Sequence, residues 1–329
     1  MQPSRRSFLF GRRPAGDSAW GRFCARLARS CLGRVEDGGE AGGASIARLA
    51  PARPADVMHA RELCAQYGVA LALAGGAPPD PGRPVLWVDP AVALTGLEPA
   101  AGAPGLWRAE AGCPVGELAA AGLAQFGGAE PGMTLAAWLA GPAGRLCPAR
   151  DTAASGVAAL DAVLADGERA TLGPFGEHDT LPLRGIAMQR LVPRLFELAA
   201  GADAQACLAA PRWPARVRLD ALRPADGRVN LGQLLLGHGG TLAWVESALL
   251  RPAAQPPDAG TGRDAADDGG AGEDLHAGGT GGGGSQGGQH AAAALQHEPP
   301  DLQAAAARLD ARAKALFDPA GALPPLPAV

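Results

Sequence analysis

The chain has 329 residues, a formal net charge of −4, six cysteines and a single tyrosine. This length can bury a substantial core, and one large or two ordinary domains are expected. The negative charge argues against general nucleic-acid binding, which needs a basic surface to contact phosphates. The cysteines are scattered without a Cys-x-x-Cys pair, which argues against a metal site and against a disulfide framework. No apolar run approaches membrane-spanning length, so no transmembrane segment is expected.

The N-terminal segment, residues 1–45, is basic in its first part. Residues 4–10, SRRSFLF, are similar to a twin-arginine export signal, but the polar GRRPAGDS follows where such a signal needs an apolar core. A cytoplasmic location is therefore expected, with twin-arginine export as the minor alternative.

Residues 18–32 have helical spacing, with Trp20, Phe23 and Leu27 on one face and arginines elsewhere. Such a helix could dock on an acidic partner or a membrane surface. Packing against its own domain is the favoured interpretation. The glycine-rich EDGGEAGGAS at 36–45 is typical of a flexible joint.

A regular pattern of helices and strands follows. It begins with a helix at 55–67 that ends at Gly68, a strand at 69–74 and a strand at 85–89. Later elements are expected in chain order at 106–112 (strand), 114–122 (helix), on both sides of a hairpin turn at Asp166-Gly167, 188–200 (helix containing Pro193), 216–222 (strand), 229–236 (short helix) and 241–250 (strand ended by Pro252). This order predicts an α+β domain over 46–252.

The chain changes character beyond Pro252. Residues 253–300 are rich in Gly, Ala, Asp and Gln, a composition that buries too little apolar surface to form a core, so a low-complexity linker is expected. A C-terminal helix at 302–317 and a tail complete the last segment, 301–329.

Several motifs in this order resemble the flavin domain of the vanillyl-alcohol oxidase / p-cresol methylhydroxylase superfamily. They are the helix–strand pair at 55–74 and the stretches AEAGCPVGELAAAGL, PGMTLAAWLAGP, VAALDAVLADGE, GHGGTLAWVESALLRP and RLDARAKALFDPAGALPP. The chain is most similar to the FAD-binding subunits of bacterial glycolate oxidases. The resemblance covers residues 50–252 and the chain end, and it implies a p-cresol methylhydroxylase-type FAD-binding domain of two α/β subdomains.

The resemblance also implies where FAD would be held. Family members lay the pyrophosphate of FAD against glycine-rich loops whose backbone N–H groups face the phosphates. The matching positions, which the resemblance assigns to noncovalent FAD binding, are Gly75, Gly76, Gly132, Thr134, Gly141, Gly239, Gly240, Thr241 and Val245.

The first two loops depart from the family pattern. The first, usually Arg-Gly-x-Gly-Thr/Ser, reads LAGGAPPD and keeps only Gly75 and Gly76. In the second, a double glycine is replaced by Ala136 and Ala137, whose Cβ atoms oppose close approach to a phosphate. Changing both alanines to glycine is therefore expected to raise the affinity for FAD.

The third loop departs as well. Ala243 replaces a glycine, and Glu246 places a carboxylate where the family has a threonine, which is unfavourable near a dinucleotide. His238 could donate to a phosphate or flavin oxygen, but a solvated loop histidine is favoured. Asp161 and Asp166 lie in a predicted strand and turn, where capping and hairpin roles are the favoured interpretation. No catalytic residue and no metal ligand is predicted.

Two functions remain open from the sequence. The first is an FAD-binding subunit of a 2-hydroxy-acid oxidase-like flavin oxidoreductase, working with a second flavoprotein or an iron–sulfur subunit. The second is a non-catalytic flavin-domain relative that serves as an assembly or regulatory subunit. The family's substrate domain is not recognisable here, because its place in the chain is taken by the low-complexity segment.

Overall fold

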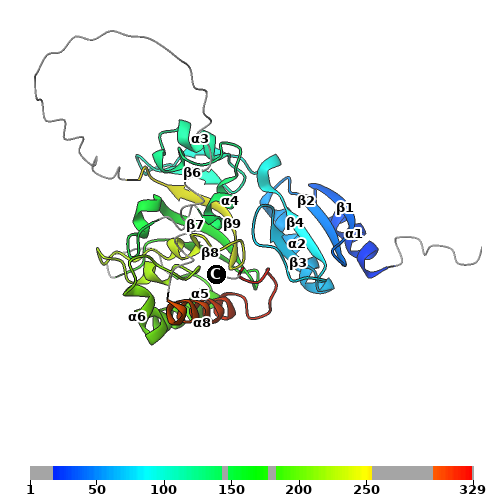
Figure 1. Ribbon diagram of the computed structural model, residues 1–329. Coiled ribbons are helices and arrows are strands. Elements are labelled where there is room, and N and C mark those ends of the chain that lie inside the picture. Colours follow the sequence, from blue (N-terminus) through cyan, green and yellow to red (C-terminus); the bar gives the residue numbers. More distant parts are fainter. Residues whose placement is uncertain (1–17, 143–146, 177–182, 254–298, 328–329) are drawn as a thin grey trace, which may run out of the picture.

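Two separate β-sheets organise the protein (Figure 1). The computed structural model describes residues 18–142, 147–176, 183–253 and 299–327. One sheet has four strands in the order β1-β2-β4-β3, and the other has five in the order β5-β6-β9-β7-β8. We call the part built on the first sheet the small unit and the part built on the second sheet the large unit.

The small unit combines an antiparallel hairpin with parallel strands. Strands β1 and β2 pair antiparallel, whereas β4 pairs parallel with both β2 and β3. Helices α1 and α2 pack against each other, and buried Phe23 and Leu27 of α1 belong to the same apolar cluster as Leu71 of β3. The elements are α1 (Ala19–Ser30), β1 (Arg34–Ala41), β2 (Ala44–Ala50), α2 (Pro54–Tyr67), β3 (Ala70–Leu73) and β4 (Val85–Val88).

The large unit is an antiparallel sheet whose central strand is β9 (Ala243–Leu250). Helix α8, the last element, packs against α5 and α6 (Figure 1). The other elements are β5 (Leu97–Pro99), β6 (Trp107–Glu110), α3 (Val115–Ala120), α4 (Leu135–Ala140), β7 (Val157–Leu164), β8 (Arg169–Leu172), α5 (Ile186–Ala200), α6 (Ala202–Leu208) and α8 (Pro300–Phe317), with 3₁₀ turns at Pro90–Val92, Ala124–Phe126, Thr152–Ser155, Leu219–Leu222 and Leu231–Leu235.

Most elements with a local signal are confirmed. Helix α2 ends at Gly68 in the left-handed conformation (φ +69°), and Gly167 makes the turn of the β7–β8 hairpin (φ +95°). The C-terminal helix is present as α8, and α1 packs within its own unit as favoured. Pro193 lies in the middle of α5. Short helix α4, within the PGMTLAAWLAGP stretch, was not anticipated.

The flexible joint expected at 36–45 is wrong, because this stretch forms most of the β1–β2 hairpin. Gly42 and Gly43 both have positive φ, +60° and +80°, which is the backbone that a tight two-residue hairpin turn requires. A glycine-rich sequence is compatible with either outcome. The sheet therefore continues across residue 45.

The strand expected at 216–222 is also wrong. The amides of Arg216 and Val217 donate to the carboxylate of Asp310 on α8, both at 2.9 Å, so a side chain takes these donors in place of a neighbouring strand. Arg218 and Asp220 then form a buried ion pair inside a 3₁₀ turn.

The linker expected at 253–300 and the export-like residues 4–10 lie almost entirely outside the described residues. Within the described ranges, no helix has the length and apolar character needed to cross a membrane.

Candidate functional site

Three segments that are far apart in the sequence meet where the two units face each other. They are the loop after β3, the end of α4 and the glycine turn before β9. The amide of Ala77 donates to the carbonyl of Gly239 at 2.7 Å. The amides of Gly237 and Gly239 donate to the carbonyls of Leu139 and Ala140 at 2.6 and 2.8 Å. The loops that the resemblance assigns to FAD therefore converge.

The glycines of this junction are required by contacts within the protein. A Cβ on Gly76 would lie 2.9 Å from the carbonyl oxygen of Gly239, and a Cβ on Gly240 would lie 3.1 Å from Cβ of Leu73. Gly75, Gly239 and Gly240 also have positive φ angles, between +70° and +80°. Their presence is explained without a ligand.

The remaining candidate residues have varied places. Thr134 is the N-cap of α4 and accepts from the amide of Ala137 at 3.1 Å. Thr241 donates its hydroxyl to the carbonyl of His238 at 2.6 Å. Gly141 ends α4, and exposed Gly132 has no atom within 4 Å of where its Cβ would be.

Six backbone donors of the loops are used within the protein. In a flavin domain these N–H groups would face a pyrophosphate. Here each donates to a protein oxygen at 2.7–3.2 Å: the donors belong to Gly76, Ala77, Ala136, Ala137, Gly239 and Thr241. A phosphate would have to displace these bonds. Ala136 and Ala137 therefore oppose phosphate binding in two ways: through their Cβ atoms and because their amides already donate to protein oxygens.

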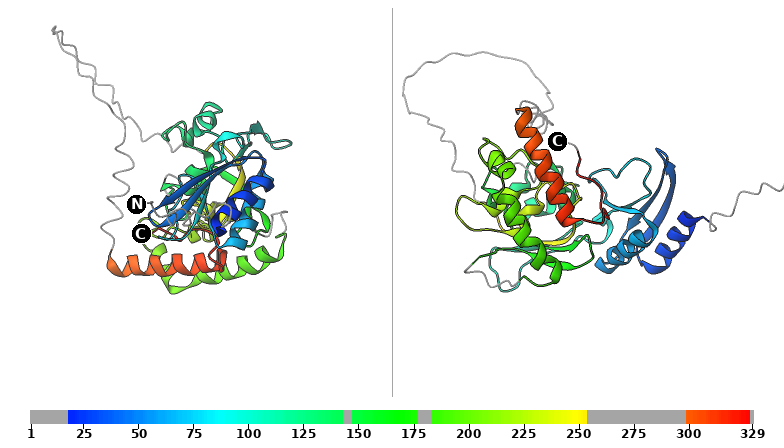
Figure 2. Two further views of the ribbon diagram at one scale, coloured as in Figure 1. Left: turned by 90° about the vertical axis from the view of Figure 1, so that its right-hand side faces the viewer. Right: turned by 90° about the horizontal axis from the view of Figure 1, so that it is seen from below.

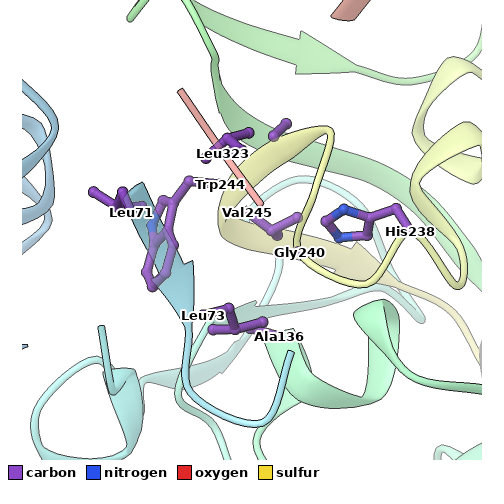
Figure 3. Close-up of a pocket in the computed structure, with 9 residues that line it drawn as sticks. Leu71, Leu73, Ala136, His238, Gly240, Trp244, Val245 and Leu323 are labelled. Atoms are coloured by element: carbon purple, nitrogen blue, oxygen red, sulfur yellow. The ribbon is translucent and has the colours of Figure 1, made fainter. Parts of the chain in front are cut away.

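Side chains fill the space between the two units around Trp244, which we call the crevice. Buried Trp244 of β9 lies among Leu71 and Leu73 of β3, Ala136 of α4 and Leu323 of the C-terminal segment (Figure 3). The cavities that Trp244 and Leu323 line measure about 10 and 20 Å³. Ligand pockets typically measure about 300–1,000 Å³. The residues around Trp244 therefore leave no room for FAD in this arrangement.

His238 lies at the edge of the smaller cavity. Its side chain is 2 % exposed, and its Nδ1 has no hydrogen-bond partner among the described residues, nor does Nε1 of Trp244. A cavity of this volume holds about one water molecule. Burial, together with the charge of Lys314, lowers the pKa of His238 to about 3, so the ring is neutral near pH 7. The expected solvated histidine is wrong, because the glycine turn folds inward.

Lys314 links the C-terminal helix to the glycine turn. Its Nζ donates to the carbonyl of Thr241 at 2.7 Å and to the carboxylate of Asp318 at 2.6 Å. Burial lowers the pKa of Lys314, and the hydrogen bond to Asp318 opposes that shift. Sequence reasoning missed this residue, since it lies in an ordinary helical pattern.

Glu246 does not line the cavities around Trp244. Its carboxylate accepts from Nε and Nη2 of Arg169 at 3.1 and 2.9 Å and lines a separate polar cleft of about 390 Å³.

The charges on the floor of this polar cleft are paired. Asp161 accepts from Arg108, Thr171 and Ser247 at 2.8–2.9 Å. Burial by itself would raise the pKa of Asp161, but these hydrogen bonds lower it below its usual value. Asp166 makes the expected turn bond, accepting from the amide of Glu168. In the described part of the chain, no group of three His, Cys, Asp or Glu side chains could hold a metal ion.

Comparison with known proteins gives structural likeness only. No protein-family model matches the chain, and no curated protein matches its sequence. Among solved structures it is similar to wild-type BBE-like 1 of Physcomitrella patens, with 16 % identity and a TM-score of 0.39 over 70 % of this chain and 44 % of that one. It is also similar to a solvent-stable cholesterol oxidase, with 17 % identity and a TM-score of 0.34 over 64 % and 36 % of the two chains.

A third similar structure is the glucooligosaccharide oxidase of Acremonium strictum, described with a 6-S-cysteinyl, 8α-N1-histidyl FAD. The match has 14 % identity and a TM-score of 0.38 over 70 % of this chain and 42 % of that one. The chain thus spans less than half the length of these oxidases. Likeness at this distance assigns neither activity nor cofactor to it.

Proposed function

We propose that this protein is a non-catalytic relative of flavin-binding domains that serves as an assembly or regulatory subunit of a flavin-dependent oxidoreductase. The observation that carries the proposal is the filled crevice, where Trp244 and Leu323 occupy the space between the units and leave cavities of about 10 and 20 Å³. A dinucleotide would have to displace both side chains.

The loops support the same conclusion. Six of their amides already donate to protein oxygens, and Gly76 and Gly240 are explained by close contacts with Gly239 and Leu73. Amides that face a phosphate in a flavin domain would be left without partners if no phosphate were bound. Each such buried donor would cost about 1–3 kcal/mol. These six amides therefore need no phosphate as a partner.

The second candidate is the FAD-binding subunit of a 2-hydroxy-acid oxidase-like enzyme that acts with a second flavoprotein or an iron–sulfur subunit. One observation favours it: the loop after β3, the end of α4 and the glycine turn lie together, as noncovalent FAD binding would need.

Flavin binding separates the two candidates. The full chain is purified, and its visible spectrum and the fluorescence of added FAD are recorded. We expect colourless protein that leaves FAD fluorescence unchanged. The double variant Ala136→Gly, Ala137→Gly should behave in the same way, because the amides of both residues are spent within the protein. A flavin spectrum, or saturable quenching by the native chain, would overturn the proposal in favour of the second candidate.

A further inference from the structure

We propose that residues 318–327, here called the strap, hold the small and large units together across the crevice and do so in the place where a flavin domain would bind its cofactor. The strap leaves the end of α8 on the large unit and runs to the small unit (Figure 2, right). This inference rests on the closed crevice of the proposed function and adds the segment that keeps the crevice closed.

The strap is anchored first on the large unit, through Asp318. Asp318 is 4 % exposed, and its carboxylate accepts from Nζ of Lys314 at 2.6 Å and from the amides of Ala322 and Leu323 at 2.8 and 2.9 Å. Lys314 in turn donates to the carbonyl of Thr241. One buried carboxylate thus shapes the start of the strap and fixes it beside the glycine turn.

The second anchor is on the small unit. The amide of Leu71 in β3 donates to the carbonyl of Ala322 at 3.3 Å, and Nη1 of Arg83 donates to the carbonyl of Gly321 at 2.6 Å. Strand β3 is the last strand of its sheet on that side. The strap therefore covers a sheet edge that would otherwise leave backbone groups open.

The third contact closes the space between the anchors. Leu323 is 6 % exposed and belongs to an apolar cluster that contains Leu71 of the small unit and Trp244 of the large unit. Leu323 and Trp244 line both small cavities. Leu323, here called the plug, therefore contacts apolar residues of both units, and its loss should release the small unit.

Hydrogen exchange of the full chain tests the strap. The variant Asp318→Asn, Leu323→Ala removes the ion pair and the plug. We expect amide exchange in β3 to accelerate at least tenfold, with β7 and β9 of the large unit unchanged. The matched control is Leu326→Ala, which removes the same atoms from the same segment, at a residue that packs against the core of the large unit. This control should leave β3 exchange unchanged.

The strap is overturned if β3 exchanges at the native rate in the double variant, or if β3, β7 and β9 all accelerate together. It is also overturned if Leu326→Ala releases β3 equally. These outcomes are independent of the flavin spectrum of the native chain, which alone decides the proposed function.

Discussion

At the scale of single residues, His238 gives the protein a defined response to acid. Its pKa is lowered from 6.5 to about 3 by burial and by Lys314, whereas in the unfolded chain it keeps its ordinary value. Below about pH 6.5 the unfolded state binds a proton that the folded state does not. The free energy of unfolding therefore falls as the pH drops, by up to about 1.4 kcal/mol per pH unit.

The variant His238→Gln removes this titration, and its melting temperature should fall less between pH 7.5 and pH 5 than that of the native chain. Circular dichroism melts measure the difference. The carboxylates of Asp56 and Asp161, whose pKa values are lowered below 3.8, stay ionised in this window. His59→Gln is the control, because His59 is only partly buried and its Nδ1 lies 3.0 Å from the carbonyl oxygen of Ser30. Equal slopes for both variants would contradict the assignment.

From residue identity alone, the turns of the candidate site could be predicted but not what contacts them. The sequence indicates that Gly75, Gly76, Gly239 and Gly240 belong to tight turns, and each turn has the expected backbone. It cannot tell whether a glycine makes room for a ligand or for another part of the chain. That distinction depends on contacts such as the one between Gly76 and Gly239, which join segments more than a hundred residues apart.

At the scale of elements, prediction succeeded where a signal is local and failed where a partner is remote. Gly68 ends α2 and Asp166-Gly167 turns β7 into β8, and both signals lie within the elements that they bound. The stretch at 216–222 has the apolar alternation of a strand, but its backbone donors are taken by Asp310 of α8. No local sequence pattern can predict a hydrogen-bond acceptor some ninety residues away.

The carboxylate of Asp310 therefore joins the last helix to residues 216 and 217. Replacement by Ala removes the acceptor of the amides of Arg216 and Val217, and we expect a loss of about 2–3 kcal/mol in the free energy of unfolding. Urea denaturation measures it. Asp301→Ala, in the exposed first turn of the same helix, is the control and should cost less than about 0.5 kcal/mol. Similar losses for the two variants would show that the carboxylate of Asp310 is not what holds this segment.

At the scale of the whole molecule, two units share one crevice, and the chain end crosses it. The order of elements was sufficient to predict a mixed α and β fold, because helices and strands alternate in a regular pattern. The filled crevice was not predictable, since Trp244 reads as one more apolar residue of a strand and Leu323 as part of a proline-rich tail. Their meeting is a property of the assembled chain.

Trp244 provides the sharpest test of a crevice that is filled rather than open. Trp244→Ala should lower the free energy of unfolding by about 3–5 kcal/mol, as expected for a large aromatic side chain lost from a core. The variant would leave an enclosed apolar cavity, and such cavities stay dry and accept small apolar ligands. Added indole should therefore raise the melting temperature of Trp244→Ala and leave that of the native chain unchanged.

Trp20→Ala is the matched control, because Trp20 lies half-buried on α1 and its loss encloses no cavity. Indole should not stabilise it. If the crevice were an open groove in solution, Trp244→Ala would cost little and indole would stabilise neither variant. A rescue confined to Trp244→Ala would mean that the indole ring of Trp244 completes the core between the two units.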